Sequence, residues 1–322
     1  MNKISTVRPY RIAVHGLPHF CQKLSELLKV DGWNVPYRSF LNPIGLVARV
    51  GDLARCDLAY SWSGRISMGK FLWAARNLGK SKIIMLWCGS DAIFAKEHLR
   101  KGFQNRWVME RVHWAVSPWL AEEVRSLGVD CEYVQTSFVA QVSSSPLPER
   151  FSVLTYAPSL SKAGLYGLDS IVNVAKRMPS IHFNLVGLKE RRIAECPSNL
   201  HVYGHVDLDR FYRETTVLWR PVRHDGLSFM VLEALAHGRH VLYSQPLLGC
   251  IHVTSEDDAC RELERLRDLH SSKSLLLHEE GRRIIARDFN AEVVRTRLLD
   301  RWEKLILLSE RDFGRTRLRV PS

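Results

Sequence analysis

Residues 224–244, HDGLSFMVLEALAHGRHVLYS, read as a loop, a helix and a strand in immediate succession. Ser228 suits the N-cap position, because its hydroxyl can accept a bond from a free amide of the first turn. The apolar run from Phe229 to His237 predicts the helix, and Gly238 suits the left-handed position just past its end. Residues 240–244 then predict a buried strand. This order of elements is typical of an α/β fold.

The predicted helix is apolar on nearly every side, which is typical of a buried helix, and Glu233 is its one charged residue. Burying an unpaired carboxylate costs several kcal/mol, roughly, so we expect Glu233 to have a partner or to face a polar cavity. Asp225 lies eight positions earlier, in the loop. A helix N-terminus is a ready anion site, formed here by the amides of Gly226, Leu227, Ser228 and Phe229. Together these features suit a sugar joined to a diphosphate; the alternative is a buried Rossmann helix whose glutamate reaches solvent at one edge.

The spacing of the two acids resembles the acid-x7-Glu signature of the group 1 glycosyltransferases of family 4. Asp225 stands where that signature usually begins with Glu, and Glu233 matches its second acid. The resemblance implies a GT-B fold, a nucleotide-sugar donor and retention of anomeric configuration, with no cofactor and no required metal. It also implies that Glu233 binds the ribose hydroxyls and that Asp225 contacts the donor sugar, so these two residues are the expected catalytic pair.

Strand and helix signals alternate along the rest of the 322 residues. Short apolar runs predict strands in the first half, at residues 11–15, 57–61, 82–87 and 114–117. Similar runs follow in the second half, at residues 152–156, 181–186 and 217–221. Such alternation indicates parallel sheets with helices on both faces. The predicted fold class is α/β, and the resemblance specifies GT-B, with two doubly wound Rossmann-like domains facing across a cleft.

The serines and prolines of SSSPLPE, residues 143–149, predict a linker between the two domains. We therefore expect an acceptor-side domain at residues 1–145 and a nucleotide-sugar-binding domain at 150–290. Residues 291–322 would contain a C-terminal helix that crosses back toward the first domain, followed by a basic tail at 311–319.

The net charge of +12 is uneven: residues 1–150 hold 20 Lys and Arg against 12 Asp and Glu, and the remainder hold 26 against 22. A basic protein suits nucleic acid, an anionic membrane or a phosphorylated substrate. The sequence has no zinc-ligand spacing and no RNA-binding signature, so nucleic acid is not an expected partner. The expected partners are a nucleotide-sugar donor and a glycan or lipid-linked acceptor.

Residues 96–107, KEHLRKGFQNRW, mix basic side chains with two aromatic ones. This mixture suits an anionic membrane surface, and the alternative is a solvated loop with packed aromatics. The sequence has no secretory segment and no apolar run of membrane-spanning length, and its seven cysteines are scattered. We therefore expect a cytoplasmic protein that is peripheral on the inner face of the membrane.

Two glycine turns are expected on the acceptor side. Gly16 follows the first strand, where the family often has paired glycines, and would allow a substrate close to the backbone. The turn Trp87-Cys88-Gly89-Ser90-Asp91 resembles the His-Gly-Ser-Asp turn of related transferases, with Cys88 in the place of the histidine. Gly89 and Asp91 are retained, and Asp91 either binds a hydroxyl or caps a helix.

Three cations are candidates for the donor diphosphate. The family usually has a Lys-Gly pair in the turn after the strand at 152–156, where this chain has Tyr166 and Gly167. Lys162 is the cation of that turn; it either reaches the phosphates as a point charge or is an exposed loop lysine. Arg220 and Arg223 flank the end of the strand at 217–221, where they face the diphosphate, pair with Asp225 or lie exposed to solvent.

The resemblance thus implies a retaining, hexosyltransferase-type enzyme in envelope or exopolysaccharide synthesis. One alternative is a non-catalytic GT-B partner subunit that binds the donor, because Asp225, Tyr166 and Cys88 depart from the family pattern. A GT-B nucleotide-sugar epimerase is another. A Rossmann dehydrogenase would need a G-x-G-x-x-G turn, which is missing at Gly16.

Overall fold

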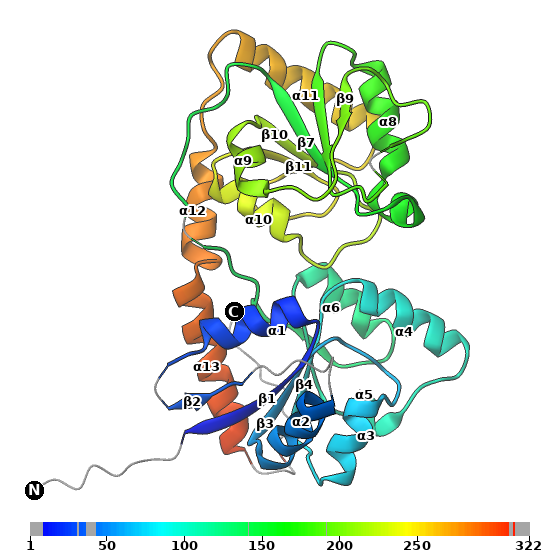
Figure 1. The fold of residues 1–322 in the computed structure, drawn as a ribbon, viewed down its shortest axis with the longest axis vertical. Helices are drawn as coiled ribbons and strands as arrows, with labels where there is room; N and C mark the ends of the chain where they lie inside the picture. Colours follow the sequence, from blue (N-terminus) through cyan, green and yellow to red (C-terminus); the bar gives the residue numbers. More distant parts are fainter. Residues whose placement is uncertain are drawn as a thin grey trace, which may run out of the picture. The chain divides into compact units, whose positions relative to one another are not determined.

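The computed structural model describes residues 9–30, 32–36, 43–140, 142–190, 192–308 and 312. The chain divides into two compact units, the first formed by residues 1–136 with 291–322 and the second by residues 137–290. Each unit contains a six-stranded sheet in which neighbouring strands are parallel (Figure 1). The predicted α/β class is confirmed. The basic tail expected at 311–319 lies outside the described residues, except for Asp312.

Unit 1 is a doubly wound sheet whose strands are ordered β2-β1-β3-β4-β5-β6. The order reverses between β1 and β3, and the carboxyl ends of the strands at such a switch point are where doubly wound sheets bind ligands. All five residues of β3 and of β4 are buried, as expected for central parallel strands. The elements are β1 (Tyr10–Gly16), α1 (Pro18–Leu27), β2 (Trp33–Asn34), α2 (Pro43–Arg55), β3 (Leu58–Trp62), α3 (Lys70–Asn77), β4 (Ile83–Trp87), α4 (Ser90–Arg100), α5 (Arg106–Met109), β5 (Val112–Ala115), α6 (Pro118–Arg125), β6 (Cys131–Tyr133) and α13 (Ala291–Leu307).

The final helix, α13, is part of unit 1 although it comes last in the sequence. Its apolar stripe is buried at Val294, Leu298, Trp302 and Leu305, whereas Leu299 at the margin of the stripe is only half-buried. The Trp302 ring meets Tyr60 of β3 edge-on, with 5.0 Å between centroids. Aromatic pairs of this geometry add about 0.5–1.5 kcal/mol beyond the buried area, so the helix is anchored against the sheet.

Unit 2 is also doubly wound, in the order β12-β11-β10-β7-β8-β9, and its switch point lies between β7 and β10. Helices α8 and α11 pack against each other and contribute to one apolar core. The elements are β7 (Ser152–Tyr156), η1 (Leu160–Lys162), α7 (Ala163–Tyr166), α8 (Leu168–Arg177), β8 (His182–Val186), β9 (Leu200–Val202), α9 (Leu208–Arg213), β10 (Val217–Arg220), α10 (Phe229–Ala236), β11 (His240–Tyr243), β12 (Ile251–His252), α11 (Glu256–Ser271) and α12 (Glu279–Asp288).

Helix α10 matches the sequence prediction to within one residue. Six of its eight residues are buried, and Gly238 takes the predicted left-handed conformation with φ 72°. The predicted hydroxyl cap is wrong, because Ser228 occupies the N-cap position with extended backbone but its side chain makes no capping bond. Ser228 is buried, at 6% exposure. The first-turn N–H groups, which a helix cannot satisfy internally, are therefore not bonded by this hydroxyl.

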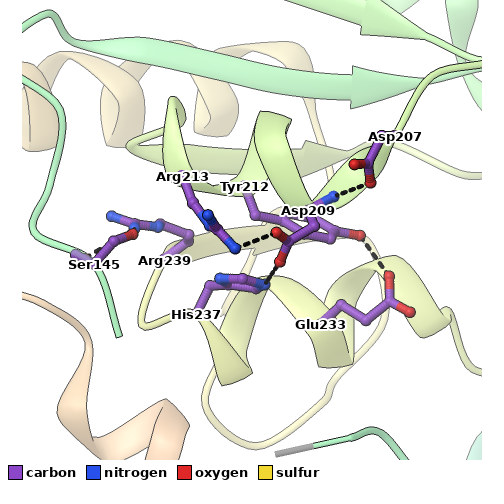
Figure 2. Close-up of polar contacts among 8 residues, drawn as sticks. All are labelled: Ser145, Asp207, Asp209, Tyr212, Arg213, Glu233, His237 and Arg239. Atoms are coloured by element: carbon purple, nitrogen blue, oxygen red, sulfur yellow. Dashed lines mark hydrogen bonds and ion pairs between the residues drawn. The ribbon is translucent and has the colours of Figure 1, made fainter. Parts of the chain in front are cut away.

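The segment that precedes β7 is bound to the body of unit 2. The fully buried guanidinium of Arg239 donates to the backbone carbonyl of Pro146, at 3.1 Å. It also donates to the backbone carbonyl of Ser145, at 2.9 Å, and Figure 2 shows these two residues side by side. A buried cation needs such acceptors to offset its lost hydration. Two residues inside the serine- and proline-rich stretch are thus held in place.

Candidate functional site

The switch point of unit 2 contains a buried ion pair. Arg220, the last residue of β10, is 7% exposed, and its Nε donates to Asp225 Oδ2 at 3.0 Å. The hydroxyl of Tyr243 donates to the same oxygen, also at 3.0 Å. The Arg220 guanidinium carbon lies 5.7 Å from the ring centroid of Tyr156 and 5.4 Å from that of Tyr166. Of the positions expected for Arg220, the structure therefore shows the pairing with Asp225.

The ionisation of this group follows from its burial and its charges. Burial lowers the pKa of Arg220. Asp225 and the phenols of Tyr243 and Tyr166 together raise it by a larger amount, so the net shift of the pKa is upward. Burial and the Asp225 carboxylate raise the pKa of Tyr243 well above its ordinary value. Arg220 thus stays cationic and Tyr243 stays a hydrogen-bond donor. Breaking one side of a buried pair typically costs about 3–5 kcal/mol, so Asp225 is held on a rigid support.

The backbone requires a glycine at position 167, in the Tyr166-Gly167 pair. Its backbone is left-handed, with φ 65°, and a Cβ atom there would lie 2.0 Å from the carbonyl oxygen of Pro221. Only glycine therefore allows this close approach of α7 to the end of β10. The tyrosine that stands in place of the family's lysine puts its ring beside Arg220. The cation beside the Tyr166-Gly167 turn is thus Arg220 of β10.

The other two predicted cations lie on the surface. Lys162 is exposed at the end of η1. The Arg223 side chain is 61% exposed and pairs with Asp169 of α8 at 2.5 Å. Of the alternatives for Arg223, the structure shows solvent exposure, with a surface pair to Asp169 in place of the suggested pair with Asp225.

Glu233 has both a hydrogen-bond partner and a polar cavity beside it, the two surroundings that the sequence predicts as alternatives. Its Oε2 accepts from the hydroxyl of Tyr212 on α9 at 2.8 Å (Figure 2), and it lines a cavity of about 340 Å³. Burial and the Glu233 carboxylate raise the pKa of Tyr212, so the phenol remains a donor. Gly226, Leu227 and Ser228 are buried ahead of the helix, and Phe229 begins it. The same cavity is lined by Val139, Ala140, Val142, Val206, Asp207, Leu208, Asp209, Ala236 and His237.

His237 is a second polar group on the cavity wall. Its side chain is 4% exposed, and its Nε2 lies 3.3 Å from Asp209 Oδ1, while its Nδ1 is buried without a hydrogen-bond partner. Burial lowers the pKa of His237 despite the opposing effect of Asp209, so the ring is neutral near pH 7. Arg213 also binds Asp209 (Figure 2). The cavity therefore offers carboxylate acceptors and one neutral imidazole between apolar walls.

Sequence reasoning missed four residues of the site: Tyr156, Tyr212, His237 and Tyr243. Tyr243 and Tyr156 end buried strands, and an aromatic hydroxyl at the carboxyl end of a parallel strand is a signal that could have found both. Tyr212 gives no such signal, because it lies 21 residues from its partner Glu233, on a different helix.

The two acceptor-side glycines have structural reasons in unit 1. Gly16 has φ 147°, and a Cβ there would lie 2.6 Å from Cβ of Trp62 on the neighbouring strand β3. Gly89 has φ 134° and precedes the first residue of α4. Both positions require glycine for backbone reasons, independently of any substrate.

Asp91 fixes the turn before α4. Its carboxylate oxygens accept from the backbone amides of Gly64 at 2.8 Å, Cys88 at 3.0 Å, Gly89 at 2.9 Å and Ala92 at 3.1 Å. Burial raises the pKa of Asp91, and these amides only partly oppose that shift. Asp91 is the second residue of α4, and the N-cap position is held by Gly89, with no side-chain capping bond. The predicted capping role is therefore not the one observed, because the carboxylate binds amides around the turn; contact with a substrate hydroxyl stays a prediction.

The cations of residues 96–107 are mostly paired within unit 1. Lys96 contacts Glu123, Lys101 contacts Glu97 and Arg106 contacts Glu110, each at 2.6 Å. Phe103 is 59% exposed, whereas Trp107 lies beneath the guanidinium of Arg111. Three of the four basic side chains thus have a local counter-charge, and membrane contact by this segment stays a prediction.

Two features are missing from the part of the chain that the structure describes. No group of three or more His, Cys, Asp or Glu side chains within it is arranged to hold a metal ion. None of its helices combines the length and the apolar character that a bilayer crossing needs.

Residues 153–259 match the family model described as glycosyl transferases group 1. The match covers the region from β7 to the first turn of α11, including the Arg220–Asp225 pair and Glu233, whereas Val139, Ala140 and Val142 of the cavity wall lie before it. A search of curated proteins finds no relative of this sequence. The predicted resemblance to group 1 glycosyltransferases is confirmed for this region of the chain.

Solved structures share the fold at low identity. Sucrose-phosphate synthase of Thermosynechococcus elongatus has a TM-score of 0.68 at 13% identity, over 94% of this chain and 100% of that one. HepE of Anabaena, solved with UDP and glucose, has a TM-score of 0.61 at 10% identity, over 91% and 99%. A TarM variant of S. aureus, solved with UDP among its ligands, has a TM-score of 0.57 at 10% identity over 81% of this chain; the alignment spans 59% of the TarM chain. These likenesses identify the GT-B fold.

Proposed function

We propose that this chain, which contains a group 1 glycosyltransferase domain at residues 153–259 of a GT-B fold, transfers a sugar from a nucleoside diphosphate sugar to a glycan or lipid-linked acceptor. The observation that carries the proposal is the arrangement of the segment 225–233. It joins an aspartate anchored by a buried arginine, a helix N-terminus and a glutamate in a cavity. These are the groups that a sugar, a diphosphate and a ribose need.

The donor nucleoside is assigned to the Glu233 cavity. A carboxylate accepts from two vicinal ribose hydroxyls, and Tyr212 holds Glu233 in place at 2.8 Å. The apolar walls formed by Val139, Val206 and Ala236 suit the flat faces of a base.

The diphosphate is assigned to the N-terminus of α10 and to Arg220. The amides of Gly226, Leu227, Ser228 and Phe229 precede or begin the helix, where N–H groups and the helix dipole favour an anion. Arg220 contacts Asp225 through Nε, and its two Nη nitrogens are assigned to phosphate oxygens. Lys162 and Arg223 add positive charge from the exposed turn and strand end.

The reaction forms a glycosidic bond between the acceptor hydroxyl and the anomeric carbon, and breaks the bond from that carbon to the diphosphate oxygen. The hydroxyl proton passes to the leaving phosphate, on the same face of the sugar, so configuration is retained. Asp225 contacts the donor sugar, while the amides and Arg220 stabilise the leaving charge. Losing one such donor typically costs about 10²–10³-fold in rate. No metal or other cofactor is included in this proposal.

A non-catalytic partner subunit and a nucleotide-sugar epimerase are the competing functions. The buried cation at the switch point favours a catalytic chain over a degenerate one, because Arg220 supplies the charge that Tyr166 cannot. We further propose a place in envelope or exopolysaccharide synthesis, in the cytoplasm at the inner face of the membrane. An anionic membrane surface is then a further partner, and nucleic acid is not.

A thermal-shift screen against UDP, GDP, ADP, dTDP and CMP, with NAD as the control, tests the donor assignment. A ligand at 100 times its Kd stabilises the native state by about 2.7 kcal/mol, so one diphosphate should raise the Tm clearly. The matching nucleotide sugar is then incubated with and without acceptor extracts. Turnover to a new glycoside supports the transferase, and interconversion of free nucleotide sugars supports the epimerase. Binding without turnover supports the partner subunit, and no shift with any diphosphate contradicts the donor site.

A further inference from the structure

Unit 1 has its own cation cluster at the switch point between β1 and β3. His15 lies near the end of β1, Arg49 is on α2, and Lys70 begins α3. These three line a cavity of about 280 Å³ together with Val50, Asp52 and Phe71. Arg65 follows the end of β3, so the cluster occupies the edge of the sheet where doubly wound folds bind ligands.

The charges of this cluster favour an anion. Burial, followed by the charges of Arg49 and Arg65, lowers the pKa of His15 to about 4. The neutral ring stacks on Phe71 with 4.2 Å between centroids, and Arg49 Nη2 lies 2.5 Å from its Nδ1. Among the described lining residues, Asp52 carries the negative charge, and Arg49 and Lys70 carry two positive charges. Cations that crowd a neutral histidine attract a counter-ion with more than one oxygen.

The Arg65 side chain lies beside the backbone that precedes α3. A Cβ atom at Gly69 would lie 1.7 Å from Arg65 Nη1, so the guanidinium rests over the glycine just before α3. Because this nitrogen is the far end of a flexible side chain, the contact places the guanidinium beside Gly69 without requiring glycine there. The guanidinium is thus held between the end of β3 and the start of α3, and its charge is felt at His15.

Exposed apolar side chains lie on the two helices, α2 and α3, that line the cavity. Val50, which also lines the cavity, is 44% exposed, Val47 on the same helix is 72% exposed, and Trp73 on α3 is 62% exposed. Trp73 lies one turn after Lys70 and one turn before Arg76 on the solvent face of α3. A tryptophan between cations is typical of surfaces that contact lipid chains beneath anionic head groups.

We propose that this cavity binds the acceptor of the transfer and that the acceptor is a phosphorylated lipid. Its phosphoryl oxygens contact Arg49, Arg65 and Lys70, and its hydrocarbon lies along Val50 and Trp73. The inference rests on the proposed transferase function, which assigns the donor to unit 2 and leaves this site for the acceptor. It goes beyond that function by naming the acceptor's chemical class.

The test uses the full chain and vesicles of phosphatidylcholine with or without phosphatidic acid. The chain should sediment with the phosphatidic acid vesicles only. Arg65→Gln and Lys70→Gln should each weaken this binding about tenfold, the usual loss for one charged hydrogen bond. Lys101→Gln is the matched control, because Lys101 is an exposed cation of unit 1 paired with Glu97, and it should bind as the parent does.

Two further measurements distinguish binding of the lipid's hydrocarbon from binding of its phosphate. Trp73→Ala should weaken vesicle binding but leave the affinity for glycerol phosphate unchanged. Equal binding by the parent, Arg65→Gln and Lys70→Gln, or an equal loss in Lys101→Gln, overturns the site. Binding of glycerol phosphate with no sedimentation of phosphatidic acid vesicles overturns the lipid.

The nucleoside diphosphate Tm shift is measured on every variant. A preserved shift shows that unit 2 is folded and that the donor site is intact. A chain that binds nucleotide but not vesicles refutes the acceptor inference alone. A chain that binds vesicles through Arg65 and Lys70 but binds no nucleotide refutes the donor function instead.

Discussion

The two switch points of the molecule use the same sheet geometry with opposite electrostatics. In unit 2, Arg220 is 7% exposed and forms an ion pair with Asp225, with 3.0 Å between Nε and Oδ2. In unit 1 Arg49, Arg65 and Lys70 surround the neutral His15. The comparison shows that the two sheets place charge differently at the same point of the strand order. We propose that the pair in unit 2 positions the reacting sugar and that the cluster in unit 1 retains an anion.

The largest expected effect comes from breaking the neutral pair. Arg220→Met leaves Asp225 without its cation, which should lower the free energy of unfolding by about 3–5 kcal/mol and abolish transfer. Urea denaturation and a transfer assay measure the two effects. The double variant Arg220→Met, Asp225→Asn should recover much of the stability but none of the activity. Recovery of activity would mean that neither residue contacts the donor.

Acid should destabilise unit 1 through a buried histidine. His113 Nδ1 accepts from the indole of Trp87 at 3.0 Å, and burial lowers the pKa of His113 to about 4. Because the unfolded chain binds this proton near pH 6.5 and the folded chain does not, stability is fully present above pH 6.5. It falls as the pH decreases toward 4, by about 3 kcal/mol at most.

Urea midpoints followed by tryptophan fluorescence at pH 7 and pH 4.5 measure this loss. His113→Gln should flatten the pH dependence even though its stability at pH 7 is lower. An unchanged slope in that variant would assign the acid sensitivity to other groups.

A smaller effect is expected at the ribose. Glu233→Ala should weaken nucleoside diphosphate binding about 10- to 100-fold while the fold survives, since one or two charged hydrogen bonds are lost. Tyr212→Phe, which removes only the supporting hydroxyl, should cost less. Calorimetric titration measures both variants. Unchanged affinity in Glu233→Ala would remove this residue from the nucleotide site.

The smallest effect concerns the exposed cation of unit 2. Lys162→Ala should weaken binding of a nucleoside diphosphate by about threefold, because an exposed charge pair contributes at most about 1 kcal/mol. The nucleoside without phosphates should bind equally to both proteins. If affinity for the nucleoside falls to the same extent, Lys162 does not contact phosphate. The loss of affinity in Lys162→Ala can then be compared with the loss of vesicle binding in Arg65→Gln, which shows how much more a half-buried cation contributes to phosphate binding than an exposed one.

The pattern of apolar residues predicted the elements well. The strand at 152–156 matches β7, and α10 starts at the predicted residue, because periodicity, caps and glycine are local signals. The Ser228 hydroxyl cap failed, since position alone does not direct a buried side chain. The capping use of Asp91 also failed, since this residue lies inside α4 and its carboxylate binds four amides around the preceding turn.

By itself, the sequence determined the α/β class, the loop–helix–strand of residues 224–244 and the need of Glu233 for polar surroundings. Each of these follows from neighbours along the chain. Only the tertiary structure decided the partners: Tyr212 for Glu233, Tyr243 and Arg220 for Asp225, and Asp169 for Arg223. These contacts mostly join different elements, so they depend on strand order and helix packing. A carboxylate's requirement for a partner is local physics, but which partner it finds is set by the fold.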